Sequence, residues 1–183
     1  MNIFYLDPNP EIAAQYHCDK HVVKQVLESA QLLCTTHHVV FPGSPWLNHM
    51  YKPFAPNHPC AKWVRESRDN YEWLYELYIC LYNEYFHRFG KIHASYIKLD
   101  NYIKVPPYGM IPRGFTQPAI VTSAQFNWMN SPIDSYRAYY AVRKNDMLKY
   151  TKRKKPEWIE QYLDWYSCYM DNLDISVQED FLE

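Results

Sequence analysis

The placement of glycine and proline is the feature that most constrains the fold of this chain. Its 183 residues include only 4 glycines, too few for an architecture of many short strands joined by tight hairpins. The 13 prolines gather between stretches of helical apolar spacing, where they start or end helices. We therefore predict an all-α fold, a compact single-domain bundle of about five helices with long Pro-rich loops.

Apolar spacing and capping residues give the boundaries of these helices. The first is expected from Pro10 to about Thr36, with Asn9 as its N-cap and a break near Cys18-Asp19 as the two-helix alternative. The other expected helices cover 59–89, 92–103, a segment that begins at Ser131-Pro132, and 156–170. Residues 1–170 are then one helical domain, followed by an acidic C-terminal tail at 171–183.

Composition also suggests where the protein works. No apolar run approaches the roughly 18 residues that a membrane span needs, and no signal peptide is recognisable. The 5 cysteines are odd in number and scattered, which is typical of reduced thiols. We expect a cytoplasmic monomer that needs no cofactor and no membrane.

The net charge of −1 conceals a basic stretch near the C-terminus. Residues 143–155 hold seven basic side chains and one acidic side chain, with Tyr150 among them. Cations interleaved with aromatic rings suit contact with a nucleic-acid backbone and its bases, which makes Lys152 and Arg153 candidate phosphate ligands. A solvated helix end explains the same run equally well.

A polar segment, His17-Cys18-Asp19-Lys20-His21-Val22-Val23-Lys24, interrupts the first amphipathic helix. His17 and His21 lie four residues apart on one helical face, and Lys20 and Lys24 form a second row beside them. We predict that this segment is the working surface of the protein.

Several explanations fit this surface. Histidines at i and i+4 are half of many helical zinc sites, so His17 and His21 could bind a metal. The residues that could complete such a site are Cys18, Asp19, Glu28, His58 and His93. Acid–base or imine chemistry on a nucleotide sugar is the second hypothesis, and phosphate binding without turnover is the third. A solvated face with two incidental histidines is the structural alternative.

A second cluster surrounds the start of the next helix. His58 precedes Pro59, at a helix N-terminus where backbone N–H groups and the helix dipole favour an anion. Arg65 and Arg68 follow on the same helix, three residues apart. The functional hypothesis is a phosphate clamp that faces the first helix, and the alternative is a capping turn beside two surface arginines.

Short motifs in the first half of the chain resemble a known family. Residues 1–8, Met-Asn-Ile-Phe-Tyr-Leu-Asp-Pro, and the run Glu11–Gln15 are similar to the opening of the pyrimidine-dimer DNA glycosylases of the endonuclease V type. Asn57-His58-Pro59 and the long aromatic helix ending at Phe89-Gly90 match the family's second segment. The resemblance covers roughly residues 1–92.

The resemblance implies a mechanism. Members are compact helical enzymes whose N-terminal α-amino group attacks the sugar C1′, forms an imine and cleaves the glycosidic bond, after which a lyase step can follow. A helix glutamate stabilises the sugar cation, and basic residues hold phosphates. The implied substrate is duplex DNA with a damaged or modified base, which the enzymes flip out of the stack.

Carried over to this chain, the resemblance places the reactive amine at Met1 or Asn2. Lys20-His21 stands opposite the family's Arg-Glu pair, so His21 becomes a candidate catalytic group, and a shifted register offers Asp19 or Glu28 as the carboxylate. The candidate phosphate ligands are Lys20, Lys24, His58, Arg65, Lys152 and Arg153. A non-catalytic nucleic-acid or nucleotide-binding module, and a metal-dependent enzyme built on His17 and His21, remain as alternatives.

Overall fold

The computed structural model describes the backbone of residues 2–123, 126 and 131–179, and side chains as far as residue 171. Seven α-helices make up this part of the chain: α1 Pro10–Tyr16, α2 Asp19–Val40, α3 Pro59–Glu66, α4 Arg68–Phe89, α5 Ala94–Ile103, α6 Pro132–Lys144 and α7 Trp158–Glu179. Two short 3-10 turns, Leu47–His49 and Asn145–Met147, lie in the connections. The all-α prediction is confirmed, with more helices than the expected five.

Two of the expected helices are each divided by a capping residue. The alternative with a break near Cys18-Asp19 is confirmed, because His17 and Cys18 are extended between α1 and α2. The segment expected as one helix from 59 to 89 breaks at Ser67, which is also extended. The Ser67 side chain accepts a hydrogen bond from the N–H of Asp69 and so caps α4. The sequence did not indicate this break, because the helical apolar spacing continues on both sides of Ser67.

The ends of two helices also differ from the prediction. Helix α2 continues past Thr36 to Val40, and α7 continues past Met170 to Glu179. Helix α4 ends as expected at Gly90, whose φ of 66° is the left-handed conformation that glycine adopts without steric cost.

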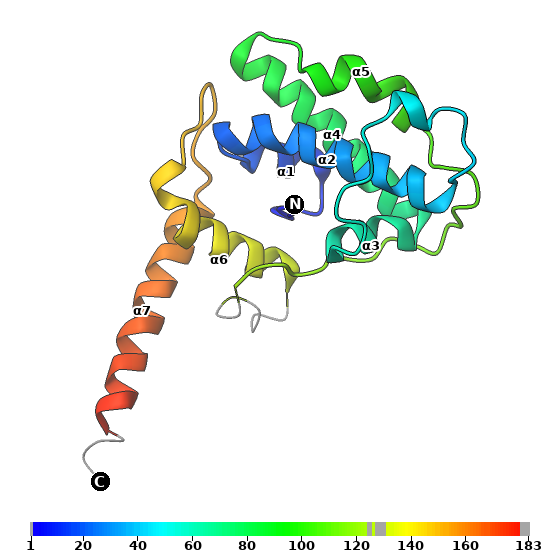
Figure 1. Ribbon diagram of the computed structural model, residues 1–183. Coiled ribbons are helices and arrows are strands. Elements are labelled where there is room, and N and C mark those ends of the chain that lie inside the picture. Colours follow the sequence, from blue (N-terminus) through cyan, green and yellow to red (C-terminus); the bar gives the residue numbers. More distant parts are fainter. Residues whose placement is uncertain (1, 124–125, 127–130, 180–183) are drawn as a thin grey trace.

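The core consists of two clusters that meet at the N-terminal segment. One joins α2, α4 and α5, and its largest buried side chains include Leu33, Tyr71 and Tyr78. The other joins the N-terminal segment to α6 and α7 through rings such as Phe4 and Tyr140. The start of the described chain therefore runs through the middle of the molecule, between α2 and α6 (Figure 1).

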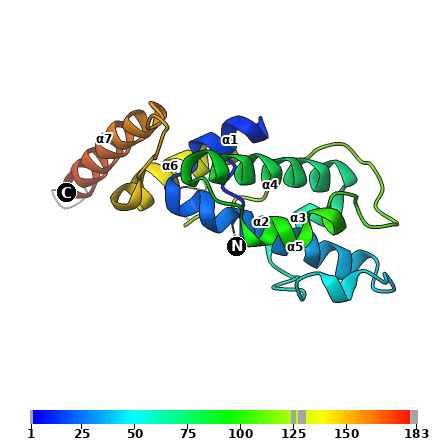
Figure 2. The same cartoon turned by 90° about the horizontal axis from the view of Figure 1, so that it is seen from above.

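Helix α7 projects from the rest of the protein (Figures 1 and 2) and packs against α6 near its own start. Trp158 and Ile159 are the buried residues of that contact. The proposed division into a domain of residues 1–170 and a tail at 171–183 stays a prediction. Among the described residues, no helix has both the length and the apolar character that crossing a membrane requires.

Candidate active site

The start of the chain is held at the centre of the molecule by burial on both sides. Ile3 and Leu6 are fully buried, and the half-buried Asn2 donates a hydrogen bond from Nδ2 to the carbonyl of Val121 at 2.7 Å. Met1 lies outside the described residues.

The first turn of α3 packs against this N-terminal segment. Burial raises the pKa of the Cys60 thiol, and the backbone of Ile3 and the positive charge of the chain's N-terminus act in the opposite direction. The positive charge at the start of the chain therefore affects the pKa of a residue in the first turn of α3.

Glu28 presents a constrained carboxylate from the middle of α2. Its Oε2 accepts a hydrogen bond from Gln25 Nε2 at 2.8 Å, and its Oε1 lies 3.3 Å from Lys24 Nζ. Gln25 is 1% exposed, whereas the Lys24 side chain is 65% exposed. The carboxylate is thus held between a buried amide and a solvated ammonium group, and 12% of the Glu28 side chain stays open to solvent.

His58 completes this group of residues from the N-cap of α3. Its Nδ1 accepts a hydrogen bond from the N–H of Cys60 at 3.2 Å. Burial lowers the pKa of His58, the N-terminal charge lowers it further, and Glu28 acts against both. We call Lys24, Gln25, Glu28 and His58 the Glu28 cluster. It draws on α2, on α3 and on the region where the chain begins.

The structure buries most of the segment 17–24, which was predicted as the working surface, and leaves Lys20, Val23 and Lys24 exposed. His17 and Cys18 are fully buried, and Asp19 and His21 are 9% and 5% exposed. His17 Nδ1 donates to the carbonyl of Ala13 at 2.6 Å, while its Nε2 has no hydrogen-bond partner in the described structure. Burial lowers the pKa of His17 to about 4, so the ring is neutral at physiological pH.

His21 occupies an aromatic pocket of the second core cluster. The Tyr140 hydroxyl accepts the N–H of Cys18 at 2.8 Å and forms a hydrogen bond with His21 Nδ1 at the same distance. The ring of His21 stacks on Phe4, with centroids 4.6 Å apart. Burial, followed by the charges of neighbouring groups, lowers the pKa of His21 to about 3. These contacts account for the side chain structurally, and its catalytic role stays a prediction.

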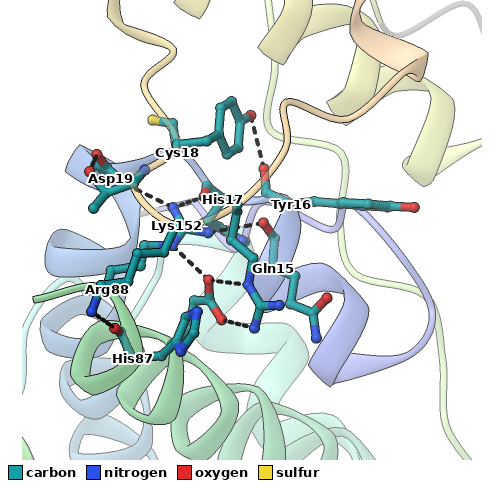
Figure 3. A network of polar contacts seen from close by, with 12 residues as sticks. Gln15, Tyr16, His17, Cys18, Asp19, His87, Arg88 and Lys152 are labelled. Atoms are coloured by element: carbon teal, nitrogen blue, oxygen red, sulfur yellow. Dashed lines mark hydrogen bonds and ion pairs between the residues drawn. The ribbon is translucent and has the colours of Figure 1, made fainter.

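Asp19 belongs to a buried ionic network rather than to an open site (Figure 3). Arg88 Nη1 lies 3.0 Å from Asp19 Oδ1, and Arg88 also donates to the carbonyls of Gln15 and His17. Glu84 accepts from Arg88 Nε at 2.6 Å and from both Nε and Nη2 of Arg153. We call Asp19, Glu84, Arg88 and Arg153 the buried network. It ties the α1–α2 junction to α4 and to the basic stretch.

Hydrogen bonds keep the two acids of this network ionised. Burial raises the pKa of Asp19, but bonds from Thr151 and Arg88 outweigh it and the pKa is lowered overall. The pKa of Glu84 is also lowered, because Arg153 and Arg88 offset the effect of burial. Asp19 therefore forms its hydrogen bonds with groups of the protein itself. No observation favours its predicted role as a reserve catalytic carboxylate, which stays a prediction.

The predicted phosphate ligands divide into two groups. Lys20 is exposed, and Lys24 and His58 belong to the Glu28 cluster, so these three can meet a substrate. The other three make contacts within the protein: Arg65 donates to the carbonyls of Pro56 and Ala61, Lys152 to that of His87, and Arg153 to Glu84. The clamp expected between α3 and the first helix stays a prediction, for His58 and for Arg65 alike.

A metal site on His17 and His21 lacks support. Within the described ranges, no group of three or more His, Cys, Asp or Glu side chains is arranged to hold a metal ion. The first histidine donates to a helix carbonyl and the second bonds a tyrosine hydroxyl, so the two imidazoles are engaged in separate contacts.

A comparison with protein families decides the wider assignment. The family model for pyrimidine dimer DNA glycosylases matches residues 1–98, more than half of the chain. The chain belongs to the pyrimidine dimer DNA glycosylase family. Searches of curated proteins and of solved structures found no match. The matched part contains the N-terminal segment, the Glu28 cluster and the buried network's acids, while α6 and α7 lie beyond it.

Membership of this family supports a DNA glycosylase type of activity on a DNA substrate. It also makes Glu28 a stronger candidate for the carboxylate of the site. The sequence alone offered Glu28 only as one of two carboxylates in a shifted register. Glu28 lies seven residues after His21, two helical turns along the same face of α2. The signal that could have identified it is local: Lys24 and Gln25 precede Glu28 by four and three residues, the spacings that bring side chains together on a helix.

Proposed function

We propose that this protein is a DNA N-glycosylase with an associated lyase step, in which the α-amino group at the start of the chain is the nucleophile and Glu28 is the catalytic carboxylate. The observation that carries the proposal is the Glu28 cluster: inside the part matched by the family, a constrained carboxylate and a capping histidine share an electrostatic environment with the chain's N-terminal charge.

In the proposed reaction the amine attacks C1′ of a damaged nucleotide. The C1′–N glycosidic bond breaks with its electron pair going to the base, which takes up a proton, and the amine loses a proton. The C1′–O4′ bond then breaks with its electron pair going to O4′, which is protonated, while the lone pair of the amine nitrogen forms the C1′=N bond of a protonated imine. The carboxylate of Glu28 stabilises the positive charge that develops on the sugar, because a preorganised charge acts strongly in a partly desolvated site. An α-amino group with an ordinary pKa near 7.7–8.0 is partly neutral at pH 7 and can act as this nucleophile.

The remaining residues of the site bind the DNA strand in this proposal. Lys20 and Lys24 contact phosphates from the exposed face of α2, and His58 does so from the start of α3. Asn2 positions the N-terminus through its hydrogen bond to Val121. His21 and Asp19 are buried side chains of the first turn of α2, and in this proposal they support the site through the packing of that turn.

Borohydride trapping tests this mechanism. The wild-type chain is incubated with a duplex that contains either an abasic site or a pyrimidine dimer, and borohydride reduces any imine to a stable covalent adduct. We expect an adduct with the free N-terminus and none when the N-terminus is acetylated or extended by a tag. An adduct that survives the block would refute the α-amine as nucleophile and direct attention to Lys20 or Lys24.

The same assay separates the alternative function. A non-catalytic binding module would give salt-sensitive DNA binding without an adduct under any of these conditions. The full chain is used throughout.

A further inference from the structure

The connection between α6 and α7 is fastened to the start of α2 by hydrogen bonds. The N–H of Asp19 donates to the carbonyl of Lys149 at 2.8 Å. The Asp19 carboxylate accepts from the N–H and from the hydroxyl of Thr151, at 2.9 and 2.7 Å. Figure 1 shows this connection beside the α1–α2 junction. Two segments that lie far apart in the sequence therefore contribute to one surface.

The same connection contains a constrained turn. Lys152 has a φ of 58°, a left-handed conformation that is uncommon for a residue other than glycine. Such a conformation persists where the surrounding contacts hold it, and it is frequent in functional segments. Here Lys152 Nζ donates to the carbonyl of His87 at 2.8 Å, and the guanidinium group of Arg153 binds Glu84. These two cations are thus engaged with α4, while Lys149 stays exposed at the surface.

Cations from three elements meet at this junction. Lys20 and Lys24 lie one helical turn apart on the exposed face of α2, and the backbone of Lys149 is bonded to the residue before Lys20. Lys144 is the last residue of α6. Burial lowers the pKa of His21 to about 3, and the neighbouring charges that add to this effect include those of Lys144 and Lys24. We call Lys20, Lys24, Lys144 and Lys149 the junction lysines.

The acids beside the junction lysines offset only part of their charge. Asp19 is already paired with Arg88, and Glu28 with Lys24. Asp146, in the 3-10 turn after α6, is the exposed acid of the connection itself. The other three junction lysines therefore leave this surface net positive.

We propose that the junction lysines bind backbone phosphates of the DNA duplex on one side of the reacting nucleotide, so that the connection between α6 and α7 adds a second DNA contact to the part of the chain that the family shares. The family match ends at residue 98, well before this connection. The inference rests on the proposed function, because that function places the reacting sugar at Glu28. Lys20 precedes Glu28 by eight residues, about 12 Å along α2, and Lys149 lies at the far end of that distance. At about 3.4 Å per base pair, the contact falls about four base pairs from the reacting nucleotide.

The salt dependence of binding to an undamaged duplex tests the surface without any chemistry. Each lysine–phosphate contact contributes about 0.9 to the slope of log K against log[salt], so Lys149→Gln should lower that slope by about 0.9 and weaken binding about fivefold at 0.15 M salt. Lys144→Gln should act in the same way. Urea unfolding of Lys149→Gln should match the wild type, because the bond to Asp19 uses the backbone carbonyl.

Lys104→Gln is the matched control, since Lys104 is an exposed lysine at the end of α5. It should leave the slope and the affinity unaltered. Wild-type slope and affinity in Lys149→Gln, or an equal loss in Lys104→Gln, would overturn the proposal.

Duplexes with arms of unequal length test the one-sided placement. An abasic site is given one arm of about three base pairs and one of about ten, and a second duplex has the two lengths exchanged. We expect the wild type to bind one of these duplexes more weakly, and Lys149→Gln to bind both alike. Wild-type binding that does not depend on which arm is short would overturn the placement. If borohydride trapping by the wild type fails while the slopes change as expected, the proposed function falls and the DNA-binding surface stands; trapping with an unchanged slope in Lys149→Gln gives the reverse.

Discussion

Helix α2 carries two groups of polar side chains, and they serve opposite purposes. The first turn contributes Asp19 to the buried network, where each charge has a partner and the Arg88 side chain is fully shielded from solvent. The second and third turns contribute Lys24, Gln25 and Glu28 to the Glu28 cluster, where the carboxylate has a solvent-exposed lysine on one side. Buried polar groups that form hydrogen bonds with one another stabilise one arrangement of the fold, whereas a group that reacts must remain accessible to the substrate. Polarity along the sequence does not distinguish the two.

The largest expected effect comes from breaking the buried network. Arg88→Met leaves Asp19 and Glu84 buried without their shared cation, and removing one partner of such a pair costs about 3–5 kcal/mol. Urea unfolding followed by circular dichroism measures the loss. Arg68→Met is the matched control, because Arg68 pairs with Glu72 on the same helix but lies on the surface, so its loss should stay below about 1 kcal/mol. Equal losses of unfolding free energy in the two variants would mean that the buried network contributes no more to stability than the surface ion pair.

Glu28→Gln should have the next largest effect, on activity instead of stability. The amide retains the shape of the side chain but cannot stabilise a sugar cation, so we expect base excision to fall by about 10²–10³-fold, typical of losing one preorganised electrostatic group. Single-turnover cleavage of a lesion-bearing duplex measures this. The unfolding free energy should change little. Asp19→Asn is the comparison in the other region, and it should lower stability more than it lowers the rate per folded molecule.

Much of the helical framework was predictable because its signals are local. Pro10, Pro59 and Pro132 start helices with capping residues directly before them, and Gly90 ends one. Ser67 was missed because a capping serine within continuous apolar spacing resembles a helical serine. Local rules gave the type of structure correctly and failed where one side chain competes with the helix for a backbone N–H.

The candidate site was harder to predict because its context is not local. His17 and His21 were expected at the surface, yet the hydroxyl that binds His21 belongs to Tyr140, 119 residues away. Arg88 is likewise 69 residues from Asp19. A single sequence does not show such partners. It therefore could not distinguish the buried polar groups on α2 from those able to react. Spacing favoured Glu28 only once the fold had placed His58 and the chain start near it.

The buried histidines predict how stability depends on pH. The pKa of His21 is about 3 in the folded protein, against an ordinary value of 6.5, so the unfolded chain binds the proton first as the pH falls. Stability from this group is complete above pH 6.5 and is lost progressively below it. Between pH 7 and pH 5 the loss from His21 is about 2 kcal/mol. Urea titrations at both values measure it.

His21→Gln provides the control for this dependence. Glutamine can still form a hydrogen bond with the Tyr140 hydroxyl but does not titrate, so the variant should be less stable at pH 7 and lose less stability on acidification. An identical pH dependence in both proteins would show that His21 is not neutral and buried. The buried acids do not confuse the result, because the lowered pKa values of Asp19 and Glu84 keep both ionised throughout this range.

The smallest predicted effect concerns Gln25, which connects burial with reactivity inside the Glu28 cluster. Gln25→Met keeps the volume of the side chain but removes the N–H that orients Glu28 Oε2, so we expect kcat to fall about tenfold while KM stays near the wild-type value. Gln31→Met, on the same helix, should leave both constants unchanged. A rise in KM alone would mean that Gln25 acts on DNA binding. Unchanged kcat would mean that Lys24 is sufficient to position the carboxylate, and the exposed half of the cluster would then govern its geometry.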